Sequence, residues 1–208
     1  VYILADTFFI SFYSGADGLA VLNMILPVFG MMYAIGSMIG IGSATRYGIS
    51  KAKGEESDHY FTQSVSWTLL FSIPFVLTGI FVPDKFLALL GADASLVELG
   101  KTYLRIILVV APLFMCNYSV TAFARNDHAT STVMAGSLAG SAFNIVFDYI
   151  FIFPVGLGFS GAALATAFCP AVTILTCSTH YLSKKCEIGF KWKKLSVRHL
   201  ISCCQLGV

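Results

Sequence analysis

Residues 130–153 form an apolar run that contains a single charged side chain, Asp148. A helix of this length can cross the hydrocarbon core of a bilayer. A charge inside such a helix costs at least about 3 kcal/mol, so it normally faces a protein interior or a water-filled cavity. Asn144 lies one helical turn before Asp148, on the same helix face. This pair predicts a membrane bundle with a polar site inside it.

The composition places the whole chain in the membrane class. Of 208 residues, 57% are hydrophobic and 12% are charged, whereas about 25% are charged in an average soluble domain. The apolar runs are too long and unbroken for the surface helices of a soluble protein. No basic cluster is interleaved with aromatic residues, so we expect no nucleic acid partner. The six cysteines lack CxxC spacing and a His-rich neighbourhood, which disfavours zinc and disulfide frameworks and favours small apolar fillers.

Turn residues, charges and prolines divide the chain into an all-α bundle of six predicted transmembrane helices within residues 1–183. The predicted spans cover residues 1–13, 19–47, 61–82, 96–124, 130–153 and 162–182. A basic connection follows at 184–199, and residues 200–208 begin an incomplete seventh span. The first span is shorter than the roughly 20 residues that a membrane helix needs. We therefore expect a piece of a longer protein whose first helix is truncated.

Glycine and proline add local detail. Gly36 and Gly40 form a GxxxG pattern, which either lets two helices approach closely or is incidental in a glycine-rich span. The run 86–90 predicts a short helix at the membrane interface. An internal proline produces either a static kink or a moving hinge, and four predicted spans contain one: Pro27, Pro74, Pro112 and Pro170.

The positive charges predict the orientation of the spans. Three predicted connections contain ten of the thirteen Lys and Arg residues: Arg46, Lys51 and Lys53 after span two, Arg125 after span four, and Lys184, Lys185, Lys191, Lys193, Lys194 and Arg198 after span six. The other side has three, which are Lys85, Lys101 and Arg105. The positive-inside rule therefore places the loops after spans two, four and six in the cytoplasm.

Nine of the eleven acidic residues lie in breaks or at span ends, and only Asp6 and Asp148 lie inside spans. No Lys, Arg or His lies in a span interior to neutralise them. These carboxyl groups must therefore be protonated or hold a mobile cation. At 1.5 Å per residue, five oxygen-bearing side chains share a layer roughly 9–12 Å below the outer surface: Asp6, Tyr103, Asn144, Asp148 and Thr166.

Four stretches of the chain resemble the multidrug and toxic compound extrusion (MATE) family of cation-coupled efflux transporters, in its MepA/DinF-like bacterial branch. The likeness is strongest between Ala124 and Ala167. Ser11-Phe12 departs from a common Gly-Arg pair, and His128 replaces a frequent glycine. The stretches are Ala5–Ile10 with Gly15–Ala20, Gly40–Ser43 with Lys53–Glu55, Ala124–Asp127, and Asn144–Asp148 with Gly161–Thr166.

The resemblance implies the N-terminal half of a twelve-helix fold, in the inner membrane of a bacterium. It implies that a C-terminal six-helix half of the same polypeptide is its partner. In the family the first bundle binds the coupling cation, and the matching positions are Asp6, Tyr103, Asn144, Asp148 and Thr166. A sodium ion would take its oxygen ligands from Asp6, Asn144, Asp148 and Thr166, whereas a proton would need only a carboxylate.

The predicted function is antiport of a proton or sodium ion against lipophilic or cationic drugs, without a cofactor and without enzymatic catalysis. Two alternatives stay open. A lipid-linked oligosaccharide flippase of the same broad superfamily tends to carry cationic residues in its central cavity, which these spans lack. An intramembrane aspartyl protease also uses two membrane aspartates, but the residues that precede Asp6 and Asp148 do not match its motifs.

Overall fold

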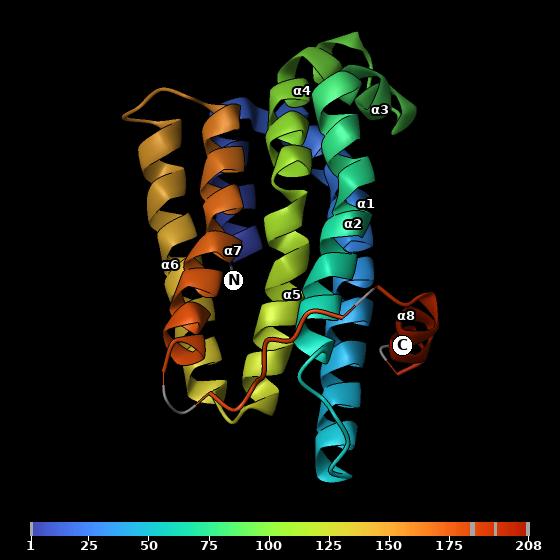
Figure 1. The fold of residues 1–208 in the computed structure, drawn as a ribbon. Coiled ribbons are helices and arrows are strands. Elements are labelled where there is room, and N and C mark those ends of the chain that lie inside the picture. Colours follow the sequence, from blue (N-terminus) through green and yellow to red (C-terminus); the bar gives the residue numbers. More distant parts are fainter. Residues whose placement is uncertain (1, 184–185, 194, 207–208) are drawn as a thin grey trace. The chain divides into compact units, whose positions relative to one another are not determined.

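The computed structural model describes residues 2–183, 186–193 and 195–206, and every regular element in these ranges is a helix (Figure 1). The predictions made for Val1, Lys184, Lys185, Lys194, Gly207 and Val208 lie outside the described residues. The helices are α1 (Tyr2–Ala52), α2 (Tyr60–Phe81), α3 (Pro83–Leu89), α4 (Ala94–Val109), α5 (Ala111–Asn126), α6 (Thr130–Ile152), α7 (Phe159–Tyr181) and α8 (Val197–Cys204).

Helix α1 is broken at Gly15, where φ is 62° and ψ is −143°. Such a backbone conformation is open to glycine and strained for other residues. The chain reverses its direction at this break (Figure 1). Its apolar part, Leu4–Ala52, has 49 residues, which at 1.5 Å per residue is roughly 74 Å, more than twice the thickness of the hydrocarbon core. The break lies inside the turn that the sequence predicts at residues 14–18.

Within the described residues, four helices are long and apolar enough to cross a membrane: α1, α2, α6 and α7. The fourth predicted span is divided here into α4 and α5, which separate at Val110 and count as a fifth candidate if they are taken together. Pro112 explains the division, because it has no N–H to donate to the Leu108 carbonyl and its ring clashes with that carbonyl, whereas proline is accepted in a first helical turn. The protein is thus an all-helical membrane protein.

The chain forms two compact units. The first contains the chain up to Met31, Pro74–Ala111 and Ser137–Val172. In it, α3 packs against α4, and Gly100 of α4 faces Val21 so closely that a Cβ there would lie 2.4 Å from the Val21 side chain. Leu87 of α3 is fully buried, whereas Leu89 is 80% exposed.

The second unit contains Met32–Ile73, Pro112–Gly136 and the chain from Thr173 onward. Here α1 lies directly against α5, because a Cβ on Gly40 would come within 2.8 Å of the Ser119 backbone nitrogen. The hydroxyl groups of Ser64 and Ser119 join α2 to α5 through a 3.0 Å hydrogen bond. A buried cluster that includes Ala44, Tyr47, Tyr60, Phe123 and Ile188 completes the core of this unit.

Candidate cation-binding site

Three helices of the first unit carry the predicted site. Asp6 belongs to α1, Asn144 and Asp148 belong to α6, and Thr166 belongs to α7. The exposed fraction of each of these residues is 4% or less. Because these side chains are buried, each of their polar atoms requires a partner, which can be a protein group, an ordered water or a bound ion.

Small and aromatic residues hold these helices together. Gly161 of α7 faces α6 so closely that a Cβ would lie 2.8 Å from the backbone carbon and oxygen of Phe151. The ring of Phe153, just after α6, lies 6.4 Å from the ring of Phe9 in α1, in an edge-to-face arrangement. These contacts lie one to two turns from Thr166 and Asp6 and fix the spacing of the three helices around the site.

A chain of hydrogen bonds links three of the predicted residues. The Asn144 Nδ2 group donates to Thr166 Oγ1 at 3.2 Å, and the Thr166 hydroxyl donates to Asp6 Oδ2 at the same distance. The carboxyl group of Asp148 is close enough to that of Asp6 for the two to interact. Four of the five predicted residues therefore converge on one buried polar cluster.

The cluster has more acceptors than donors. Four buried oxygen atoms form no hydrogen bond of normal geometry with any described residue: Asp6 Oδ1, Asn144 Oδ1, Asp148 Oδ1 and Asp148 Oδ2. Leaving a buried acceptor unsatisfied costs about 1–3 kcal/mol, and more for a charged group. An arrangement of this kind is stabilised by a proton or a metal cation among the oxygens.

Tyr103, the fifth predicted residue, is also buried, with an exposed fraction of 1%. Its ring lies 4.8 Å from that of Phe159 at the start of α7. Tyr103 thereby connects α4 with the helix that carries Thr166. Its part in cation binding stays a prediction.

No basic side chain neutralises the site. Among the buried residues in the described part of the chain, none is Lys, Arg or His. An anionic group such as pyrophosphate would therefore meet two carboxyl groups and no cation. This charge arrangement favours a positively charged ligand.

An open aromatic cavity of about 380 Å³ lies at the surface of the first unit, where Phe8, Phe12 and Tyr149 are each more than half exposed, and its lining residues are close to the site residues in sequence. Tyr149 directly follows Asp148, and Phe9 is three residues beyond Asp6. The cavity is apolar and aromatic, which suits a flat lipophilic molecule. Its lining residues are Phe8, Phe9, Phe12, Tyr149 and Phe153.

The second unit contains a polar contact that the sequence did not predict. Asp127, which the sequence places in a polar break, has a side chain that is only 2% exposed. Its Oδ2 atom lies 2.8 Å from Nε2 of His180. The two residues are 53 positions apart, so no local motif reveals their pairing.

The comparison with known families agrees with the all-helical membrane fold. The family model described as MatE matches residues 1–150. The chain belongs to the MatE family. Its match to that family covers Asp6, Asn144 and Asp148 and ends before Thr166.

Relatives of this MatE chain include multidrug export proteins. The multidrug export protein MepA of Staphylococcus saprophyticus is 30% identical over 189 residues, which cover 88% of this chain and 41% of MepA. MepA of Staphylococcus aureus is 26% identical over 212 residues, which cover 100% of this chain and 47% of that protein. The chain thus spans about half the length of these relatives.

Solved MATE structures share the fold. An inward-facing multidrug resistance MATE transporter of the MOP superfamily superimposes with a TM-score of 0.90 and 25% identity. That likeness covers 99% of this chain and 48% of the transporter. A MATE protein in a bent conformation gives a TM-score of 0.87 at 27% identity, over 99% of this chain and 47% of that protein.

Proposed function

We propose that this chain is the N-terminal half of a cation-coupled antiporter, which exports lipophilic or cationic drugs and binds its coupling cation at Asp6 and Asp148. The observation that carries the proposal is the pair of buried carboxyl groups of Asp6 and Asp148, which lie close enough to interact and include three oxygen atoms that form no hydrogen bond of normal geometry with the described residues. Two buried carboxyl groups without a basic neighbour are costly unless a positive charge joins them. A cation that binds and leaves can supply that charge reversibly.

Either a proton or a sodium ion suits this cluster. A proton on Asp148 would turn one of its oxygens into a hydrogen-bond donor toward a neighbouring acceptor. A sodium ion would take oxygen ligands from Asp6, Asn144, Asp148 and Thr166, since hard cations prefer oxygen. Both ions neutralise the same negative charge, so both support the same coupling scheme.

The coupling itself follows from competition for this charge. A lipophilic cation near the aromatic cavity is attracted by ionised carboxylates and by the faces of aromatic rings. Once the coupling cation has neutralised Asp6 and Asp148, this attraction is lost and the drug is released. Coupling between two ligands is reciprocal, so a bound drug also weakens cation binding.

The proposal includes the membrane arrangement. The chain would contribute six spans of a twelve-helix transporter in a bacterial inner membrane, with the loops after spans two, four and six in the cytoplasm. The sequence relatives support a longer protein, because the chain covers 41% to 47% of the two MepA proteins described above. A second six-helix half would complete the substrate pathway.

The deciding experiment replaces Asp148 with Asn in the full-length protein. Asp148→Asn keeps the side-chain volume and removes the charge, so gradient-driven efflux of a fluorescent lipophilic cation should fall to the level of cells without the transporter. Asp17→Asn is the matched control, because Asp17 is exposed and lies outside the site. The control should transport normally, and immunoblots should find equal amounts of both variants in the membrane.

The same assay identifies the ion. Efflux from vesicles is measured with a proton gradient and with a sodium gradient, each imposed alone. Transport should follow one of the two gradients in the wild type and neither in Asp148→Asn. Full activity of Asp148→Asn under either gradient would contradict the proposal.

A further inference from the structure

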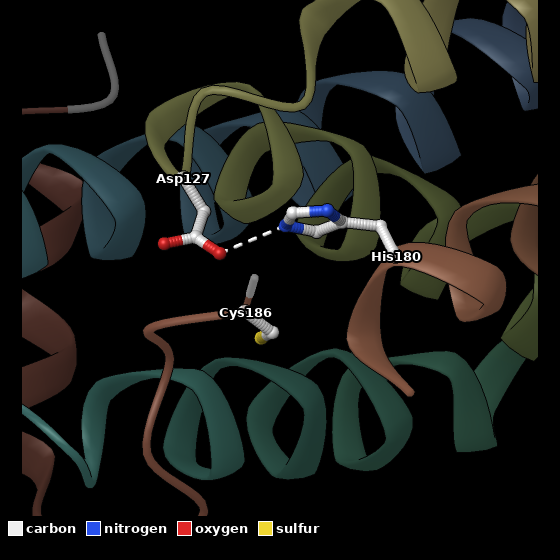
Figure 2. A group of neighbouring side chains, drawn as sticks. All are labelled: Asp127, His180 and Cys186. Atoms are coloured by element: carbon white, nitrogen blue, oxygen red, sulfur yellow. Dashed lines mark hydrogen bonds and ion pairs between the residues drawn. The ribbon is translucent and has the colours of Figure 1, made fainter. Parts of the chain in front are cut away.

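A group of three potential metal ligands lies in the second unit, separate from the cluster around Asp148. Asp127 follows the end of α5, His180 belongs to the last turn of α7, and Cys186 lies in the segment after α7 (Figure 2). In this view Asp127 and His180 face each other across their contact, and the Cys186 sulfur lies to one side of it. One ligand atom from each, a carboxylate oxygen, an imidazole nitrogen and the sulfur, all lie within 4.8 Å of one another.

We propose that Asp127, His180 and Cys186 bind a zinc ion that fastens the segment after α7 to the turn between α5 and α6. Oxygen, nitrogen and sulfur ligands from Asp, His and Cys are those that Zn²⁺ uses in proteins. Zinc bonds of about 2.0–2.3 Å place ligand atoms roughly 3.3–3.8 Å apart in a tetrahedron. The 2.8 Å contact between Asp127 Oδ2 and His180 Nε2 therefore has to lengthen by about 0.5 Å, whereas a separation at the 4.8 Å limit has to shorten by about 1 Å.

The carboxylate is already oriented for such a role. The backbone N–H of Glu187 donates to both oxygens of Asp127, at 3.3 Å to Oδ1 and 3.1 Å to Oδ2. This N–H can stay on Oδ1 while Oδ2 binds the metal. Hydrogen bonds of this kind, made to a metal-binding carboxylate by its surroundings, fix its geometry and strengthen metal binding.

The site has room for a fourth ligand. A cavity of about 270 Å³ is lined by Asp127, His180 and Glu187, among others. Water or the Glu187 carboxylate, which forms a 2.7 Å ion pair with Lys51, can complete a tetrahedron from this side. The cavity also provides the path by which the ion enters.

Metal binding changes the protonation of two residues at the site, Cys186 and His180. Cys186 loses its thiol proton to solvent, because zinc binds the thiolate. His180 must present an unprotonated Nε2 to the metal, so its single ring proton moves to Nδ1, and the contact between Nε2 and Asp127 Oδ2 is replaced by two metal bonds. Zinc with one thiolate, one carboxylate and a water as fourth ligand then forms a site with no net charge, whereas the Glu187 carboxylate in that position would leave one negative charge.

The rival interpretation is that the three residues form a metal-free clamp, in which His180 and Glu187 donate to Asp127. The experiment uses full-length protein in detergent, treated with a chelator and kept reduced. Co²⁺ is titrated as the probe, since cobalt replaces zinc and gives a charge-transfer absorption only when a thiolate binds it. We expect one cobalt per chain with this absorption, and its loss when Zn²⁺ is added.

Variants assign the ligands. Cys186→Ser should abolish the thiolate absorption, whereas Cys169→Ser, which removes a half-buried thiol from the first unit, should retain it. His180→Gln keeps a donor toward Asp127 but removes the imidazole, and it should weaken cobalt binding at least about tenfold. Thermal unfolding without metal checks that each variant is folded.

Two results would overturn the zinc site. One is a wild-type protein that binds no cobalt with thiolate absorption, which leaves the metal-free clamp. The other is a thiolate absorption that persists in Cys186→Ser or disappears in Cys169→Ser. If Cys186→Ser does not fold, His180→Gln decides in its place, and unchanged cobalt affinity there contradicts the proposal.

Discussion

Single residues in this protein are constrained by the cost of burying charge. Asp148 is completely buried, and its two carboxyl oxygens form no hydrogen bond of normal geometry with the described residues, although the group lies near the Asp6 carboxyl. Thr166 relays a hydrogen bond from Asn144 to Asp6 and so leaves Asp148 as the least satisfied member of the cluster. This is why Asp148→Asn, which removes only the charge, is the sharpest test of the proposed transport.

His128 offers a second test at the residue scale, because its φ of 60° is unusual for any residue with a Cβ. Replacement by glycine should relieve this strain, while the added freedom of the unfolded chain opposes the gain. We expect His128→Gly to raise the free energy of unfolding by no more than about 1 kcal/mol. His128→Val should lower it by about 1–2 kcal/mol, because a β-branched side chain tolerates this conformation poorly.

Thermal unfolding of the two His128 variants in detergent measures the difference. His128 is exposed, so lost core packing does not explain a change. If the valine variant were as stable as the glycine variant, the positive φ would not exist in the folded protein.

Helix packing gives a prediction at the scale of elements. A Cβ on Gly40 would lie 2.8–2.9 Å from backbone atoms of Tyr118 and Ser119, which cannot rotate away. Gly40→Ala should therefore lower the free energy of unfolding by about 1–3 kcal/mol. Gly30→Ala is the matched control in the same helix, because no atom lies within 4 Å of its added Cβ.

Gly30→Ala should be neutral or stabilising by up to about 1 kcal/mol, since alanine is the better helix former. Unfolding of both alanine variants is followed in detergent under the same conditions. Equal stability of the two variants would show that α1 does not depend on close contact with α5 at Gly40.

The start of α4 gives a pH-dependent prediction. Asp93 Oδ1 accepts hydrogen bonds from the backbone N–H groups of Leu96 at 3.0 Å and Ser95 at 3.1 Å. These hydrogen bonds hold the pKa of Asp93 below its ordinary value of 3.8. The hydrogen bond from the Leu96 N–H has the largest effect, and the hydrogen bond from the Ser95 hydroxyl has the next largest. Because the folded pKa is the lower one, this stabilisation is present above pH 3.8 and disappears as pH falls through the folded pKa.

Asp93→Asn keeps a capping oxygen and cannot ionise, so it separates charge from hydrogen bonding. The wild type should unfold at a higher temperature than Asp93→Asn at pH 7, and the difference should vanish as pH falls below 3.8. Parallel melting curves between pH 7 and 3 test this. A constant difference over the whole range would exclude the carboxylate charge as the cause.

At the scale of the whole molecule, the property to test is which side of the membrane each loop faces. We expect an added cysteine at Lys85, which is exposed near the start of α3, to react with a membrane-impermeant thiol reagent in intact cells. An added cysteine at Lys53, also exposed, should react only after the membrane is permeabilised, because positive charges retain that loop in the cytoplasm. Labelling is compared with that of the protein without added cysteines, and reaction of the Lys53 variant in intact cells would reverse the proposed topology.

The sequence alone determined the class of the protein. In a membrane, the backbone N–H and C=O groups of long apolar runs find hydrogen-bond partners within each run only if the run is a helix. The sequence also identified Asp6 and Asp148 as candidate site residues, since a charged side chain inside an apolar span is costly to bury however the helices pack. Only the tertiary structure decided which atoms meet. The hydrogen bond from Thr166 to Asp6 joins residues 160 positions apart, and the group of Asp127, His180 and Cys186 comes from three separate segments. Such contacts depend on helix packing, which local spacing in a sequence does not encode.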